Sequence, residues 1–132
     1  MIGNNILIDT NVVIELFRGN LEIRKIFDSS KIVNIPFAVL GELYFGARKS
    51  NNFKKNITLI NQLLANCVVI DADDNTSLEY GFIKSSLINK GKAIPENDIW
   101  IAAISKQYKL DLLTFDKHFL NIDEINIIKL NH

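Results

Sequence analysis

The chain has 132 residues, of which 48% are hydrophobic and 23% charged, and its 15 basic and 15 acidic side chains cancel to a formal net charge of zero. This apolar fraction excludes a disordered chain, and the length suits a single domain, residues 1–132, with its own core. Zero net charge excludes a nucleic-acid binder that relies on bulk positive charge. The single cysteine, Cys67, excludes an internal disulfide and favours a reducing compartment.

Membrane insertion and secretion are not expected. No apolar run reaches the roughly 18 residues that a membrane span needs. The first residues, MIGNNILID, lack the charged segment and long apolar stretch of a signal peptide. We therefore expect a cytoplasmic protein with no membrane partner.

The basic residues are unevenly distributed along the chain. Eight basic and three acidic residues lie between Arg18 and Lys55. This pattern is typical of solvated helix faces, and it also fits a basic rim that contacts a phosphate backbone. The sequence leaves both interpretations open.

The first part of the chain alternates short apolar runs with helical patterns. Residues 5–9, NILID, form an uninterrupted apolar run, which predicts a buried strand of a parallel sheet. Residues 10–19 and 20–30 then predict two helices, the first of which ends at a glycine. Residues 31–36 predict a second strand. Its final proline can open the next helix, which extends to about Lys49.

The remaining chain continues the alternation of strands and helices. Helices are predicted at residues 53–66, 74–91 and 96–109, and strands at residues 67–71, 111–116 and 125–130. This order predicts an α/β fold with a central, mainly parallel sheet of about five strands flanked by helices.

Four acidic residues occupy positions that the fold would bring together. Asp9 ends the first predicted strand and Asp116 ends the fourth. Glu42 lies on the helix after the second strand, and Asp98 opens the helix that leads into the fourth. Ligand sites of open α/β sheets lie beyond the carboxyl ends of the strands, so we expect these four carboxylates to meet there. Their mutual repulsion favours a hard divalent cation, Mg²⁺ or Mn²⁺, as partner.

Each acid also has a structural interpretation. Asp9 and Asp98 could be helix N-caps, and Asp116 could stabilise a turn. Glu42 could face solvent on one side of an amphipathic helix. The shared location of the four acids favours a functional site over four separate explanations.

Other candidate residues are weaker. His118 and His132 have no partner at metal-ligand spacing, which argues against zinc, and no histidine is positioned as a general base. Cys67 and Trp100 are interpreted as packing residues. No glycine-rich phosphate-binding motif follows the first strand.

Four segments, ILIDTNVVIELFRG, VLGELYFGA, IPENDIWIAAIS and LLTFDKHF, together resemble a PIN domain. More narrowly, they resemble the ribonuclease toxins of bacterial VapBC toxin–antitoxin modules. The resemblance covers nearly the whole chain in the same order. It implies a PIN-like three-layer fold and a metal-dependent ribonuclease that uses Mg²⁺, for which Mn²⁺ substitutes.

The resemblance assigns roles to residues of this chain. It implies four catalytic acids, Asp9, Glu42, Asp98 and Asp116. Asp9 and Asp98 are expected to bind the metal, with Glu42 and Asp116 binding directly or through water. It implies three supporting residues, Thr10, Asn11 and Thr114. Glu96 is an additional acid, either a ligand or a bystander, and the number of metal ions stays open.

The resemblance also implies partners. These are an RNA substrate, a small VapB-like antitoxin and a second copy of the chain in a homodimer. We expect the helix that carries Leu43, Tyr44 and Phe45 to offer a groove for an amphipathic antitoxin segment. An inserted arginine would pair with the acids. The identity of the RNA stays open.

Alternative functions remain at this stage. One is an RNA-processing PIN nuclease without a toxin role, and another is a PIN-like protein that only binds partners. From a different class, a Mg²⁺-binding phospho-receiver domain would place acids at strand ends, and the segment CVVIDADD imitates its acceptor strand. Against this, Asp9 stands alone after the first strand, and the last strand offers only Lys129.

Overall fold

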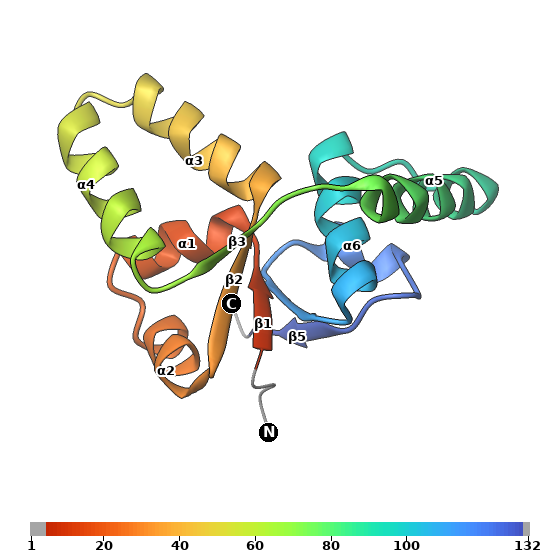
Figure 1. The fold of residues 1–132 in the computed structure, drawn as a ribbon, viewed down its shortest axis with the longest axis horizontal. Coiled ribbons are helices and arrows are strands. Elements are labelled where there is room, and N and C mark those ends of the chain that lie inside the picture. The colour runs from red at the N-terminus through yellow and green to blue at the C-terminus, as the bar shows by residue number, and fades with distance from the viewer. Residues whose placement is uncertain (1–4, 131–132) are drawn as a thin grey trace.

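The computed structural model describes residues 5–130. In this part of the chain, Figure 1 shows a sheet between two groups of helices. The strands are β1 (Asn5–Ile8), β2 (Ile32–Pro36), β3 (Val68–Ile70), β4 (Asp111–Thr114) and β5 (Ile127–Lys129). The helices are α1 (Thr10–Phe17), α2 (Leu21–Ser29), α3 (Phe37–Lys49), α4 (Phe53–Leu64), α5 (Asp74–Asn89) and α6 (Glu96–Tyr108), with a 3₁₀ helix η1 (Lys117–Asn121).

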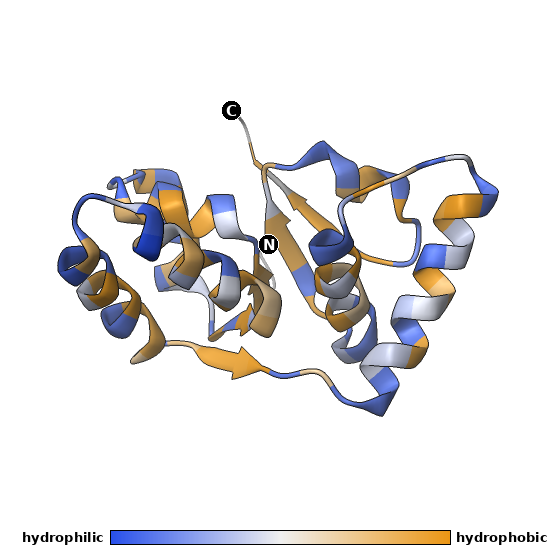
Figure 2. Ribbon diagram, turned by 90° about the horizontal axis from the view of Figure 1, so that it is seen from above, coloured by the Kyte–Doolittle hydropathy of each residue, from blue (hydrophilic) through white to orange (hydrophobic). Residues whose placement is uncertain are grey.

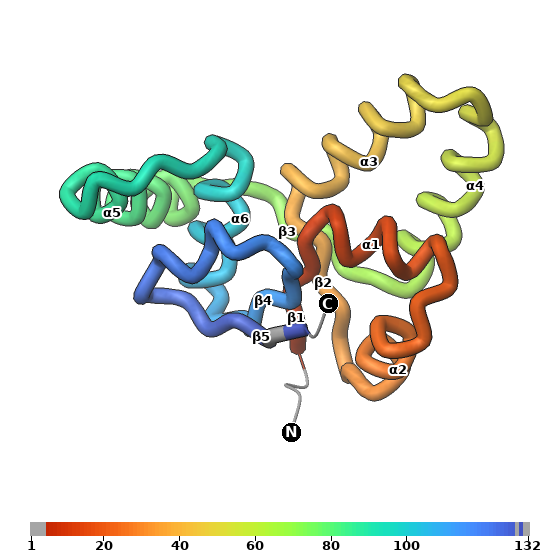
Figure 3. The backbone as a smooth tube through the Cα atoms, turned by 180° about the vertical axis from the view of Figure 1, so that it is seen from behind, coloured from red at the N-terminus to blue at the C-terminus, as the bar shows by residue number. Residues whose placement is uncertain are grey.

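The strands form one sheet in the order β3-β2-β1-β4-β5, and every neighbouring pair is parallel. The chain moves outward from β1 to β3 and then returns across β1 to β4. Because crossovers between parallel strands are right-handed, this reversal places α1 to α4 on one face and α5 and α6 on the other. Figure 3 shows the same two groups of helices from behind. The predicted α/β fold with a layered parallel sheet is confirmed.

The core lies on both faces of the central strands. In β1, Ile6, Leu7 and Ile8 are fully buried, as are Leu112 and Leu113 in β4. Figure 2 shows these strands as a hydrophobic layer between helices of mixed polarity. Burial on both faces explains why the predicted strands read as uninterrupted apolar runs rather than as alternating ones.

The parallel pairing of β1 with β4 positions the candidate site. Leu7 pairs with Leu112 and Ile8 with Leu113, and the backbone N–H of Asp9 donates to the carbonyl of Leu113 at 3.1 Å. The carboxyl ends of two strands that are about a hundred positions apart in the chain therefore lie side by side. No helix among the described residues has the length and apolar character needed to cross a bilayer.

Candidate active site

Asp9 is the residue at which β1 turns into α1. Its Oδ1 accepts a hydrogen bond from the backbone N–H of Thr10 at 2.8 Å, so the side chain caps the helix. Its Oδ2 accepts a hydrogen bond from the hydroxyl of Thr114 at 2.7 Å. Asp9 is 5% exposed, and burial raises the pKa of its carboxyl although both hydrogen bonds oppose this shift. The capping interpretation of Asp9 therefore holds alongside its place at the site.

Thr114 links two of the acids across the β1–β4 pair. It is the last residue of β4 and is buried. Its hydroxyl donates to Asp9 and accepts from the backbone N–H of Asp116 at 2.9 Å. The side chain of Asp116 in turn caps η1, accepting from the backbone N–H of His118 at 2.9 Å. One hydroxyl thus bonds the carboxylate of Asp9 and the backbone of Asp116 at the end of the sheet.

Asp98 lies in the first turn of α6, where it faces the same end of the sheet. The interpretation of Asp98 as an N-cap is wrong, because Pro95 occupies the cap position and Asp98 is the third residue of the helix. The backbone carbonyl of Pro95 accepts a hydrogen bond from the N–H of Asp98 at 3.0 Å. Burial, together with the negative charges of Asp9 and Asp116, raises the pKa of Asp98 to about 6.

Glu42 reaches the site from α3. It is half-buried, and its Oε1 accepts a hydrogen bond from the side-chain amide of Asn97 at 3.4 Å. Burial and the charge of Asp9 raise the pKa of its carboxyl, and the hydrogen bond from Asn97 partly offsets this effect. Glu42 therefore does not simply face solvent.

The charges of Asp9 and Asp116 raise the pKa of neighbouring carboxyls. Asp9 raises the pKa of both Glu42 and Asp98. Asp116 raises the pKa of Asp9 and Asp98. We call Asp9, Glu42, Asp98 and Asp116 the acidic site. Its members come from four separate segments, as expected from the strand order.

The donor set of the acidic site suits a hard divalent cation. All four side chains offer carboxylate oxygens, which Mg²⁺ and Mn²⁺ prefer, and a positive charge would remove the mutual repulsion. A second observation points the same way. The Thr10 hydroxyl, close enough to Glu42 to lower the pKa of that carboxyl, is buried without a hydrogen-bond partner of normal geometry among residues 5–130.

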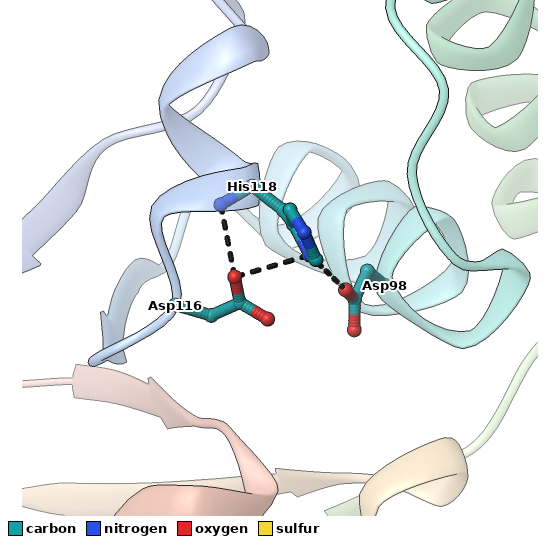
Figure 4. A group of neighbouring side chains, drawn as sticks. All are labelled: Asp98, Asp116 and His118. Atoms are coloured by element: carbon teal, nitrogen blue, oxygen red, sulfur yellow. Dashed lines mark hydrogen bonds and ion pairs between the residues drawn. The ribbon is translucent and has the colours of Figure 1, made fainter.

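His118 is at the site, and the expectation that it has no partner is wrong. Figure 4 shows its imidazole between the carboxylates of Asp98 and Asp116. Nδ1 lies 3.1 Å from Asp116 Oδ1 and 3.4 Å from Asp98 Oδ2. Donor atoms of these three side chains all lie within 4.8 Å of one another, so the group could hold a metal ion. His132, the other histidine, lies outside the described residues.

Three further residues near the site differ in their contacts. Glu96 binds Lys84 at 2.5 Å and also accepts from the hydroxyl of Tyr80. It therefore contacts α5 and is engaged away from the other acids. Asn11 is exposed, and within residues 5–130 it makes no hydrogen bond to the acidic site, so its supporting role stays a prediction. Asn97, which the sequence reasoning missed, supplies a hydrogen bond to Glu42.

A groove of about 380 Å³ runs from the acidic site between α1, α3 and α4. Glu42 and Thr10 line one part of it, and Arg18 and Lys55 line another. The wall includes buried apolar residues such as Leu43, whereas Tyr44 and Phe45 are exposed and do not line the groove. Of the residues expected to form a groove on α3, only Leu43 does so.

Cys67 and Trp100 are packing residues, as the sequence suggested. Burial raises the pKa of the Cys67 thiol to about 11, which disfavours the reactive thiolate. Trp100 stacks on Tyr80 with ring centroids 4.1 Å apart and meets Phe37 edge-on. Both side chains pack against the core.

Known proteins resemble this chain over most of its length. The PIN domain family matches residues 6–125. A ribonuclease VapC2 from Haemophilus influenzae is 34% identical over 110 residues, which cover 82% of this chain and 83% of that protein.

Solved structures show the same fold. A chain of DNA-bound VapBC from Salmonella typhimurium is 26% identical with a TM-score of 0.86, covering 94% of this chain and 96% of that chain. A chain of VapBC-1 from nontypeable Haemophilus influenzae gives the same values. Since the family match spans nearly all described residues and the ribonuclease relative exceeds 30% identity over most of both chains, this chain belongs to the PIN domain family, and within it to the VapC ribonucleases.

Proposed function

We propose that this chain is an endoribonuclease that depends on Mg²⁺, for which Mn²⁺ substitutes, and that residues 1–132 form a single nuclease domain. It would act as the toxin of a toxin–antitoxin pair. The observation that carries the proposal is the convergence of four carboxylates at the ends of β1 and β4, with raised pKa values at Asp9, Glu42 and Asp98. Such a group is poorly stabilised by the fold alone and well suited to a cation and a phosphodiester.

The burial of the acids supports the roles that we propose for them. Asp9 and Asp98 are the least exposed and would bind the cation directly, while Glu42 and Asp116 bind it directly or through water. When bound, the cation supplies Lewis acidity that activates water and offsets charge on the leaving oxygen. Glu42, a half-buried acid that lines the groove, would orient the attacking water.

Supporting residues fix the acids before any substrate arrives. Both oxygens of Asp9 are engaged, one by the Thr10 N–H and the other by the Thr114 hydroxyl. Asn97 holds one oxygen of Glu42. Hydrogen bonds of this kind orient metal-binding side chains, and their loss usually costs activity.

The phospho-receiver alternative fits the topology poorly. In receiver-type folds of strand order 2-1-3-4-5, the third strand lies beside the first. Here β3 is an edge strand and β2 separates it from β1. The acidic residues after β3 are therefore remote from Asp9, and Asp73 instead caps α5.

The test is incubation of the purified chain with total RNA, with and without Mg²⁺ or Mn²⁺, followed by mapping of the cut ends. We expect discrete cleavage that requires the cation and disappears in Asp98→Asn. RNA that stays intact with both metals would contradict the proposal. Cleavage that persists unchanged in Asp98→Asn would point to a contaminating nuclease and remove the support for this site.

We further propose that an antitoxin inhibits the enzyme by occupying the groove between α1, α3 and α4. An arginine of the antitoxin would pair with Glu42 and compete with the cation, while acidic residues would meet Arg18 and Lys55 at the other part of the groove. An apolar segment between them would contact the wall that includes Leu43.

Co-purification with the product of the neighbouring gene tests this regulation. We expect a complex in which RNA cleavage is suppressed, and weaker inhibition when Lys55 is changed to Glu. If the two proteins do not associate, or if the complex cleaves RNA normally, the chain is better described as an RNA-processing nuclease without a toxin role.

A homodimer is the second proposed assembly. Exposed apolar side chains on α3 and α5, including Phe45 at 64% and Phe82 at 54%, offer surface that a second copy could bury. Light scattering of the wild type should give twice the chain mass. Phe45→Ser and Phe82→Ser should shift the mass toward that of one chain, and a monomeric wild type would contradict the assignment.

A further inference from the structure

The imidazole ring of His118 contacts two acids of the acidic site. Its Nδ1 is directed at one oxygen of Asp98 and one of Asp116, two acids that come from different elements (Figure 4). The imidazole is half-exposed, so an ion from solvent can approach it together with both carboxylates. The backbone N–H of His118 already satisfies Asp116 Oδ1, so the cap does not require the ring.

We propose that His118 is a nitrogen ligand of the cation held by Asp98 and Asp116, and that it gives this site a preference for Mn²⁺ over Mg²⁺. The inference rests on the proposed metal-dependent nuclease and adds to it a ligand and a choice of metal. It concerns Asp98 and Asp116, which contact the histidine, and not the groove residue Glu42, which accepts a hydrogen bond from Asn97.

The distances between donor atoms support a shared ion. Two ligands in adjacent positions of an octahedral ion of this size lie about 3 Å apart, as follows from metal–ligand bonds of about 2.1 Å. The observed separations from Nδ1 are 3.1 Å to Asp116 and 3.4 Å to Asp98. Both separations from Nδ1 are thus near the spacing that one ion requires, and the donor atoms of all three side chains lie within 4.8 Å of one another.

The chemistry of imidazole explains the expected preference. Mg²⁺ selects oxygen ligands and keeps much of its water, whereas imidazole nitrogen binds the transition metals well. A site of oxygen donors alone would discriminate little between Mg²⁺ and Mn²⁺. The addition of His118 therefore shifts the balance toward Mn²⁺.

A purely structural role for the ring makes a different prediction. In that case Nδ1 would only donate a hydrogen bond to Asp98 Oδ2, and an asparagine amide at position 118 could reproduce this bond. His118→Asn therefore separates the two roles, since it retains a donor near the Nδ1 position but removes the imidazole nitrogen. Lys117→Gln is a matched control, because Lys117 is the exposed neighbour in η1 and its substitution changes only local charge.

The experiment measures nitrogen coupling to bound Mn²⁺ by pulsed electron paramagnetic resonance. The full chain is prepared with ¹⁵N only in histidine and loaded with one equivalent of Mn²⁺. We expect a ¹⁵N coupling of directly bound imidazole in the wild type and in Lys117→Gln, and its loss in His118→Asn. Titration calorimetry should show Mn²⁺ affinity reduced about tenfold or more in His118→Asn, and Mg²⁺ affinity reduced much less.

A wild-type spectrum without ¹⁵N coupling at saturating Mn²⁺ overturns the inference, and this result does not depend on any variant being folded. Coupling that persists in His118→Asn overturns it as well. Equal losses of Mn²⁺ and Mg²⁺ affinity would overturn the preference. RNA cleavage without coupling leaves the proposed function intact, whereas coupling without any cleavage supports the ligand and contradicts the nuclease.

Discussion

Two acids on the first turn of α6 lie two residues apart and have opposite surroundings. Glu96 faces α5, where Lys84 and Tyr80 bind it, and these contacts lower the pKa of its carboxyl. Asp98 faces the sheet, where burial and two other carboxylates raise its pKa to about 6. The contact between α5 and α6 neutralises its acids with lysines, whereas the acidic site has no lysine or arginine paired with its acids among the described residues. Glu96 is thus paired by side chains of the protein, whereas the carboxylates of the acidic site are available to bind a cation.

Removing the charge of each acid in turn tests whether Glu96 and Asp98 have different roles. Asp98→Asn should reduce RNA cleavage about 100-fold or more while leaving the fold intact, because a metal-binding carboxylate is lost. Glu96→Gln should cleave RNA at nearly the wild-type rate. Single-turnover rates with circular dichroism as a folding control test both variants, and equal losses in the two would erase the distinction between the acids.

Metal binding should stabilise the folded protein through the acids of the acidic site and not through Glu96. At about 100 times the dissociation constant, Mg²⁺ or Mn²⁺ should raise the free energy of unfolding by roughly 2.7 kcal/mol. For a domain of this size, the melting temperature should then rise by roughly 10 °C. Differential scanning calorimetry should show the same increase in Glu96→Gln and little of it in Asp98→Asn. A wild-type melting curve that millimolar metal leaves unchanged would contradict a cation site.

Thr114→Val removes the hydroxyl that joins Asp9 to the segment of Asp116. Asp9 would lose a buried hydrogen bond of 2.7 Å, and the variant should be about 1–3 kcal/mol less stable. Cleavage should fall roughly 10- to 100-fold through misplacement of the acids. Urea denaturation and cleavage rates measure the two effects. Thr114→Ser, which keeps the hydroxyl, should recover most of the activity, and failure to do so would assign the effect to packing.

Stability of the metal-free protein should depend on pH with the sign that a raised pKa dictates. Asp98 has a folded-state pKa of about 6 and an ordinary value of 3.8 when unfolded, so the folded state binds more protons between these values. Its stabilising effect is present below about pH 4 and is lost as the pH rises through about 6, by about 1–2 kcal/mol in all. Glu96, with a lowered pKa, acts in the opposite direction.

Urea denaturation at several pH values between 4 and 7, in the presence of a chelator, measures this dependence. Asp98→Asn should flatten the profile, and saturating Mg²⁺ should reverse it because the cation binds the ionised acids. A metal-free wild type that becomes more stable over the same interval would contradict the raised pKa.

The helices and strands were predictable because their signals are local. Burial of β1 and β4 on both faces produces uninterrupted apolar runs, and the alternation with helical periodicity implies a parallel sheet. Strand direction then implies that Asp9 and Asp116 share one end of the sheet. These inferences need no knowledge of side-chain contacts.

The parts of the site that sequence reasoning missed depend on tertiary contacts. The sequence predicts no metal-ligand partner for His118 because none lies at a suitable spacing along the chain, yet Asp98 approaches it from another helix. Its position two residues after Asp116, in the turn that follows a central strand, was the available signal. The prediction of Asp98 as a cap is wrong for a different reason, because the N-cap of α6 is Pro95, three residues earlier.

The hydrogen bond between Thr114 and Asp9 joins residues 105 positions apart. Until the ribosome has released β4, the strand β1 lacks one of its two neighbours and Asp9 lacks the donor that orients it. Asp98 and Asp116 emerge late as well. A nascent chain, or one truncated before residue 111, therefore contains most of the helices but cannot assemble the acidic site. The proposed nuclease activity therefore requires that β4 has already been synthesised.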